Sequence, residues 1–232
     1  MKKSGEAQVV DFFSKCLSDK LTQKFGTNFK HVSGNFSGSQ DRKFADYFAG
    51  TGSHNILIEF KEFKDEYRAE VRKPLRAKLC QMLSSEIAIL SRKCHFIGWK
   101  QVHADMHVTL NSYIDLVCQL WEAKFLVQTD DSNHKQFLQG FLAGDSGVGI
   151  DEFVEYVGHL NNLAGGTADG STAPFHALLY SRNDEGDLVA TRFENLEQMR
   201  ELIGMRPQPN PQHLSKNNND PDENNKGPTF NF

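Results

Sequence analysis

The sequence predicts an α/β protein whose first hundred residues run helix, three strands, helix, strand, followed by a helix-rich accessory C-terminal part. Three observations predict this class. Apolar residues at helical spacing open the chain, short runs with a period of two and Gly- or Ser-rich turns follow, and helical spacing returns after Pro74. The length of 232 residues allows one substantial core, alone or with an accessory subdomain.

The elements of the first part follow from local patterns. An apolar stripe over Ala7–Phe25 predicts the first helix, and Gly26 is its stop signal. Three short strands are expected in Asn28–Val32, Lys43–Ala49 and Asn55–Phe63, since these runs lie between turn residues.

A second helix and a fourth strand complete this part. Pro74 suits the first turn of a helix, and apolar residues recur at helical spacing from Leu75 to Leu90. The short aromatic run Cys94–Lys100 then predicts the strand.

The pattern turns helical from about Leu110, and this change places the boundaries. We expect an α/β core over residues 1–104, a helix-rich accessory region with a β-hairpin over 105–205, and a disordered tail over 206–232. The hairpin is expected around Asn183–Gly186. The tail holds five of the seven prolines and runs of Asn and Asp, a composition that favours disorder.

Composition indicates a soluble protein. Hydrophobic residues make up 38% of the chain, the mean hydropathy is −0.53, and we find neither a membrane span nor a signal peptide. We therefore expect a cytoplasmic protein with no membrane partner. The four cysteines are widely spaced and lack a Cys-x-x-Cys pair, so we expect reduced, mostly buried thiols: Cys16, Cys80, Cys94 and Cys118.

Three charged residues stand on apolar faces of the second and third strands. In an extended chain Asp46 shares a face with Phe44 and Phe48, while Glu59 and Lys61 share one with Leu57. A two-residue turn at Gly52-Ser53 would place Asp46 opposite Glu59, with Cβ atoms about 5 Å apart. Two carboxylates at this distance need a positive charge between them, either a divalent cation or Lys61 itself.

The element order, with an Asp on the second strand and Glu-x-Lys on the third, resembles the PD-(D/E)XK nuclease superfamily over about Glu6 to Lys100. On that resemblance Asp46 and Glu59 are the two acids and Lys61 is the lysine that positions or activates the attacking water. The resemblance implies that Asp46, Glu59 and the backbone carbonyl of Phe60 bind Mg²⁺ or Mn²⁺. Ala45 departs from the motif, which has a proline there.

The resemblance implies a metal-dependent endonuclease or exonuclease, with DNA as its substrate in preference to RNA. Genome defence is a role common in the superfamily. Two further residues match auxiliary positions of some members: Glu6 on the first helix and Gln81 on the second. Glu6 could equally complement the helix dipole, and Gln81 could equally be a surface residue.

Positive charge is concentrated after the third strand. The segment from Lys61 to Lys78 has seven basic and four acidic residues, in a chain whose net charge is −4. We predict that this segment holds the phosphate backbone through Lys64, Arg68, Arg72, Lys73 and Arg76. The alternative is a solvated helix face.

Two further alternatives stay open. The acids and Lys61 could form a structural ion pair, in which case the fold would serve as a catalytically inactive binding or assembly module. The helical second half would then bind a protein partner or a second copy of the chain. A zinc site built from Cys94, His95, His103 and His107 is disfavoured, because the set lacks a second close pair of ligands.

Overall fold

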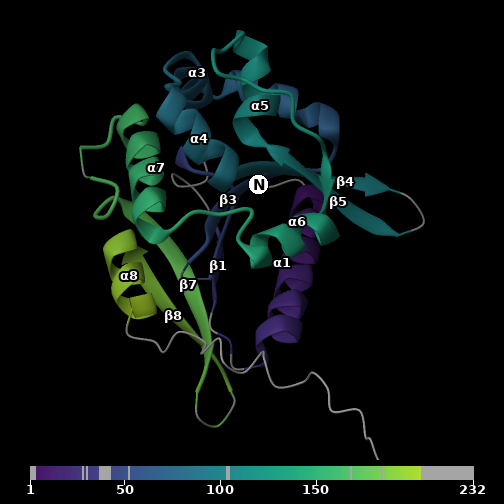
Figure 1. Ribbon diagram of the computed structural model, residues 1–232, viewed down its shortest axis with the longest axis vertical. Helices are drawn as coiled ribbons and strands as arrows, with labels where there is room; N and C mark the ends of the chain where they lie inside the picture. Colours follow the sequence, from purple (N-terminus) through teal and green to yellow (C-terminus); the bar gives the residue numbers. More distant parts are fainter. Residues whose placement is uncertain are drawn as a thin grey trace, which may run out of the picture.

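The chain is an α/β protein built on one eight-stranded, mostly antiparallel sheet with helices on both faces (Figure 1). The strand order is β6-β5-β4-β3-β2-β1-β7-β8, and β3 and β4 are the parallel pair. The computed structural model describes residues 4–27, 29, 31–36, 43–51, 53–102, 105–167, 169–183, 185 and 187–204. The predicted tail and His103 lie outside these residues.

The first part of the chain begins with a helix and three strands, as predicted, but three helical elements in place of one lead to its fourth strand. Its helices and strands are α1 (Ser4–Phe25), β1 (His31–Asn35), β2 (Tyr47–Gly50), β3 (Asn55–Lys61), the 3₁₀ helix η1 (Lys64–Arg72), α3 (Pro74–Gln81), α4 (Ser85–Cys94) and β4 (His95–Val102). The predicted second helix is wrong as a single element. Ser84 caps α4 by accepting a hydrogen bond from the Ile87 amide, so α4 begins anew after α3 ends.

The second part adds strands to both sides of the first. Its elements are β5 (Met106–Ser112), α5 (Tyr113–Val117), the 3₁₀ helix η2 (Cys118–Trp121), β6 (Ser132–Asn133), α6 (His134–Ala143), α7 (Ile150–Leu163), β7 (Pro174–Arg182), β8 (Leu188–Asn195) and α8 (Leu196–Gly204). β5 pairs with β4, and β7 pairs with β1. The predicted core and accessory region therefore share one sheet.

Alternation along β3 separates the hydrophobic core into two layers. Ile56, Ile58 and Phe60 point to the face that α1 and α6 cover, and Leu57 points to the face covered by α3, α4, α5, α7 and α8. Figure 1 shows α1 and α6 together on one side of the molecule and α7 and α8 on the other. Glu59 and Lys61 follow Leu57 at intervals of two, so they lie on the face of the larger helical layer.

The β2–β3 hairpin has the predicted register. Phe48 pairs with Leu57 and Tyr47 with Ile58, and the Thr51 amide donates to the His54 carbonyl across the turn. This register fixes the position of Asp46, which directly precedes β2, relative to the end of β3.

Two expectations for the remaining chain were wrong. The segment before Tyr113 is strand β5, where helical character was expected from Leu110, because its residues pair with Phe96 to Val102 of β4. Cys80 and Cys118 form a disulfide, with Cα atoms 5.1 Å apart, because the fold brings α3 against η2. Among the described residues, no helix has the length and apolar character that crossing a bilayer requires.

Candidate functional site

Glu59 is the buried centre of the site. Its side chain is 1% exposed and lies on β3, the fourth strand from one edge of the sheet and the fifth from the other. Lys61 and Lys73 each place Nζ 2.5 Å from Glu59 Oε1, and Arg76 Nη2 lies 3.4 Å from Oε2. Burial opposes ionisation of Glu59, but the positive charges of Lys61, Lys73 and Arg76 outweigh it and hold its pKa well below the usual range.

Asp46 reaches from the start of β2 to the backbone of β3. Its Oδ2 accepts a hydrogen bond from the Phe60 amide at 2.7 Å, and the residue is 3% exposed. The ladder between the two strands ends at Tyr47 and Ile58, so Asp46 contacts the main chain between Glu59 and Lys61 rather than pairing across the ladder. The structure thus brings the three predicted catalytic residues together.

Lys61 bridges several carboxylates. Besides Glu59, its Nζ lies 3.1 Å from Glu70 Oε1 and 3.7 Å from Glu6 Oε1. Burial opposes its charge, but Glu59, Glu70 and Asp46 raise the pKa of Lys61, so it stays a cation at neutral pH. The first turn of α1 therefore places Glu6 beside Lys61.

The predicted phosphate-binding residues divide into two groups. Arg68 and Arg72 are exposed on η1, and Lys64 is 48% exposed, pairing with Asp131 at 2.6 Å. Arg76 is 1% exposed and Lys73 is ion-paired with Glu59, so the prediction that they face a phosphate backbone needs correcting. Arg76 lies on α3 and Lys73 directly precedes this helix. Both side chains point inward, to the end of β3.

Gln81 does not share this inward position. It is exposed at the C-terminal end of α3, whereas Arg76, five residues earlier, is buried. The structure gives Gln81 the exposed position that was the alternative to an auxiliary role.

Glu70 is a site residue that the sequence did not single out. Its side chain is fully buried, and Oε1 lies 2.9 Å from Lys73 Nζ. On the other side Oε2 accepts a hydrogen bond from the Tyr113 hydroxyl at 2.8 Å and faces Arg76 Nε at 3.6 Å. No motif spacing marks it, because it lies within a run of mixed charge whose 3₁₀ geometry decides which residues turn inward.

The seven charged residues around the end of β3 form one interacting group, the charge cluster. It comprises Glu6, Asp46, Glu59, Lys61, Glu70, Lys73 and Arg76.

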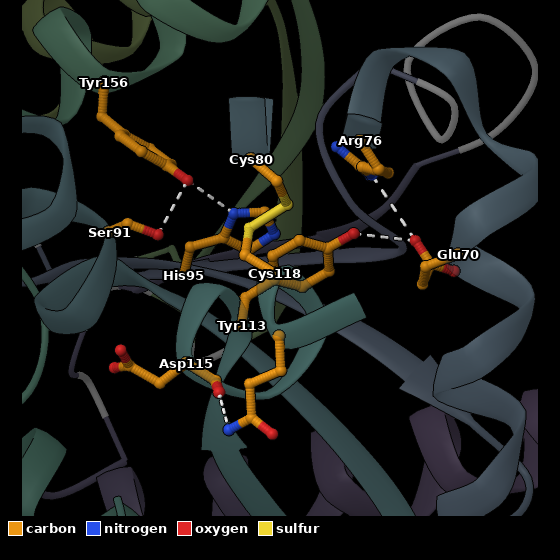
Figure 2. The surroundings of a disulfide bond; sticks show 10 residues. Glu70, Arg76, Cys80, Ser91, His95, Tyr113, Asp115, Cys118 and Tyr156 are labelled. Carbon is orange, nitrogen blue, oxygen red and sulfur yellow. Dashed lines mark hydrogen bonds and ion pairs between the residues drawn. A yellow bond between two sulfur atoms is a disulfide. The ribbon is translucent and has the colours of Figure 1, made fainter. Parts of the chain in front are cut away.

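Aromatic residues and the disulfide support one side of the charge cluster (Figure 2). The His95 ring stacks on the Tyr113 ring with centroids 4.2 Å apart, and His95 Nδ1 lies 2.7 Å from the Tyr156 hydroxyl. The disulfide joins α3, which carries Arg76, to η2, which directly follows the helix of Tyr113. Arg76 and Tyr113, which both contact Glu70, therefore lie on or next to the elements that the disulfide joins.

Burial and the charge of Arg76 lower the pKa of His95 well below its usual range, so the ring is neutral at neutral pH. Its stacking on Tyr113 and its contact with Tyr156 give it a structural role, while His103 lies outside the described residues. The part of the chain that is described contains no group of three His, Cys, Asp or Glu side chains arranged to hold a metal ion.

The charge cluster places Lys61 beside the carboxylates of Asp46 and Glu59. Carboxylate oxygens can in general bind a hard divalent cation, and a lysine can stabilise developing negative charge. In the structure, the ammonium groups of Lys61 and Lys73 both contact Glu59 Oε1. Comparison of the chain with protein-family models, curated proteins and solved structures found no match. Function is therefore inferred from the residues and geometry of this chain.

Proposed function

We propose that the chain is a metal-dependent nuclease of the PD-(D/E)XK type that hydrolyses phosphodiester bonds in nucleic acid, DNA in preference to RNA. The observation that carries the proposal is the convergence of Asp46, Glu59 and Lys61 at the end of β3. Asp46 accepts a hydrogen bond from the Phe60 amide at 2.7 Å, and Lys61 Nζ lies 2.5 Å from Glu59 Oε1. The order α1, β1, β2, β3, then η1, α3 and α4, then β4 parallel to β3, supports it.

The donor set suits a hard cation. Asp46 and Glu59 offer carboxylate oxygens, and the Phe60 carbonyl lies in the backbone between Glu59 and Lys61, so a bound ion would have oxygen ligands only. Mg²⁺ usually keeps several waters, so two carboxylates and one carbonyl are sufficient protein ligands for it. When bound, such an ion polarises the phosphate and lowers the pKa of a water ligand.

Residues of the chain would stabilise the reacting phosphate and bind the rest of the polymer. Lys61 is charged and sits beside both acids, so it can offset the negative charge that develops on the phosphate. Arg68 and Arg72 are exposed on η1, which follows β3 after two residues, so they can bind phosphates of the polymer outside the charge cluster.

The test is cleavage of DNA and RNA by wild type, Asp46→Asn and the control Asp65→Asn, with and without Mg²⁺ or Mn²⁺. Asparagine can still accept the Phe60 amide hydrogen bond, so Asp46→Asn removes charge and spares the strand contact. We expect Asp46→Asn to lose about 10²–10³-fold in metal-dependent rate. The exposed Asp65→Asn should cleave like wild type. Absence of metal-dependent cleavage of either polymer by wild type would refute the proposal.

A catalytically inactive binding module is the second candidate. The saturation of Glu59 by Lys61, Lys73 and Arg76 favours it, since such a network can be purely structural. In that case Mg²⁺ should raise the melting temperature of neither wild type nor Asp46→Asn. Retarded migration of nucleic acid without cleavage would support this candidate.

A further inference from the structure

Glu70 contacts the same three cations as Glu59. Its Oε1 lies 3.1 Å from Lys61 Nζ and 2.9 Å from Lys73 Nζ, and Oε2 lies 3.6 Å from Arg76 Nε. Each ammonium group therefore touches two buried carboxylates at once. The motif of Asp46, Glu59 and Lys61 does not include Glu70, so it does not explain this second set of contacts.

We propose that Glu70 is a positioning residue that retains the ammonium groups of Lys61 and Lys73 when a divalent cation binds Glu59. The inference rests on the proposed function. Both ammonium groups already contact Glu70 Oε1, so a cation can replace them at Glu59 Oε1 without leaving either one unpaired in a buried position. Losing that contact would carry the cost of a buried charge without a partner.

Charge balance supports the same role. The charge cluster contains three cations and four carboxylates, a net charge of −1, and a divalent cation would change it to +1. Without the Glu70 charge the cluster would be neutral before binding and would carry +2 afterwards. Glu70 therefore reduces the repulsion that Lys61, Lys73 and Arg76 exert on an incoming metal ion.

The surroundings of Glu70 hold its carboxylate in this position. The Tyr113 hydroxyl donates to Oε2 at 2.8 Å, and Figure 2 shows the dashed lines from Tyr113 and Arg76 meeting at the same Glu70 oxygen. Stacking of Tyr113 on His95 leaves the phenol little freedom to turn away. The Glu70 carboxylate is therefore held in the position needed to accept the ammonium groups of Lys61 and Lys73 when they leave Glu59.

The experiment measures Mn²⁺ binding by isothermal titration calorimetry to metal-free full-length protein. It compares wild type, Glu70→Gln and the control Glu66→Gln, which removes the same charge from η1. The Glu66 carboxylate accepts hydrogen bonds from the amides of Glu62 and Phe63. We expect Glu70→Gln to bind Mn²⁺ about tenfold more weakly than wild type, and Glu66→Gln to bind it within about twofold.

A double variant separates positioning from general damage. Glu70→Gln leaves Lys73 with Glu59 as its remaining carboxylate contact, so Glu70→Gln/Lys73→Gln should recover most of the lost affinity. A purely structural role predicts no recovery. If Glu70→Gln does not fold, Tyr113→Phe takes its place, because it keeps the charge and removes one hydrogen bond that fixes it; it should weaken Mn²⁺ binding about two- to fivefold.

The outcomes distinguish the inference from the proposed function. A wild type that neither binds Mn²⁺ nor cleaves nucleic acid overturns both. A wild type that binds Mn²⁺ and cleaves, beside a folded Glu70→Gln with unchanged affinity, overturns the role of Glu70 alone. Failure of the double variant to recover affinity, or an unchanged affinity in Tyr113→Phe where that variant is the substitute, also overturns it.

Discussion

Replacing Arg76 with methionine should lower the free energy of unfolding by about 3–5 kcal/mol, the range for removing one partner of a buried ion pair. The guanidinium is 1% exposed and donates to the main-chain carbonyls of Phe44 at 2.9 Å and Lys43 at 3.2 Å. Two lost hydrogen bonds from a charged donor account for about 3 kcal/mol. The buried carboxylate of Glu59 also loses one of its three cations, which accounts for the upper part of the range.

The matched control is Arg68→Met, because Arg68 is an arginine of the same basic segment that lies fully exposed on η1. Unfolding in urea followed by tryptophan fluorescence measures both variants. Thermal melting should place Arg76→Met about 6–20 °C below wild type. Arg68→Met should melt with wild type. A loss below about 1 kcal/mol in Arg76→Met, or equal losses in both variants, would refute the burial of Arg76 in the charge cluster.

Two other predictions concern the surface and the core. Reversing the charge of both Arg68 and Arg72 to glutamate should weaken binding of nucleic acid across sequences and flatten its logarithmic salt dependence by about 2, measured by fluorescence anisotropy; an unchanged slope would identify a solvated face. Because His95 is neutral when folded but binds a proton near pH 6.5 when unfolded, stability should be full above about pH 6.5 and fall as the pH drops through the folded pKa. His95→Phe keeps the ring against Tyr113 and should reduce this loss in urea titrations from pH 7 to 5, whereas an identical pH dependence would contradict it.

The β2–β3 hairpin could be predicted because its information is local. Alternation of apolar residues and the turn before His54 specify both the register and the face of each side chain, and the structure has that register. The convergence of Asp46, Glu59 and Lys61 followed from it. The exact contact did not, because the ladder ends one residue after Asp46 and its carboxylate turns to the Phe60 amide.

The roles of Lys73, Arg76 and Glu70 could not be predicted in the same way. Counting charges between Lys61 and Lys78 gives the sign of the segment but not the direction of each side chain. That direction depends on the 3₁₀ winding of η1 and on the packing of α3 against it, both set by the tertiary structure. The disulfide was missed for a related reason, since its cysteines are 38 residues apart in the chain.

The position of β1 and β4 inside the sheet bears on how the protein can be divided. Neither strand is an edge, because β7 covers β1 and β5 covers β4. A fragment ending at residue 104 would expose both strands along their full length, and unpaired strand edges join those of other molecules. Such a fragment should therefore aggregate even though it contains every residue of the charge cluster. The second half of the chain serves the first by closing both sides of its sheet.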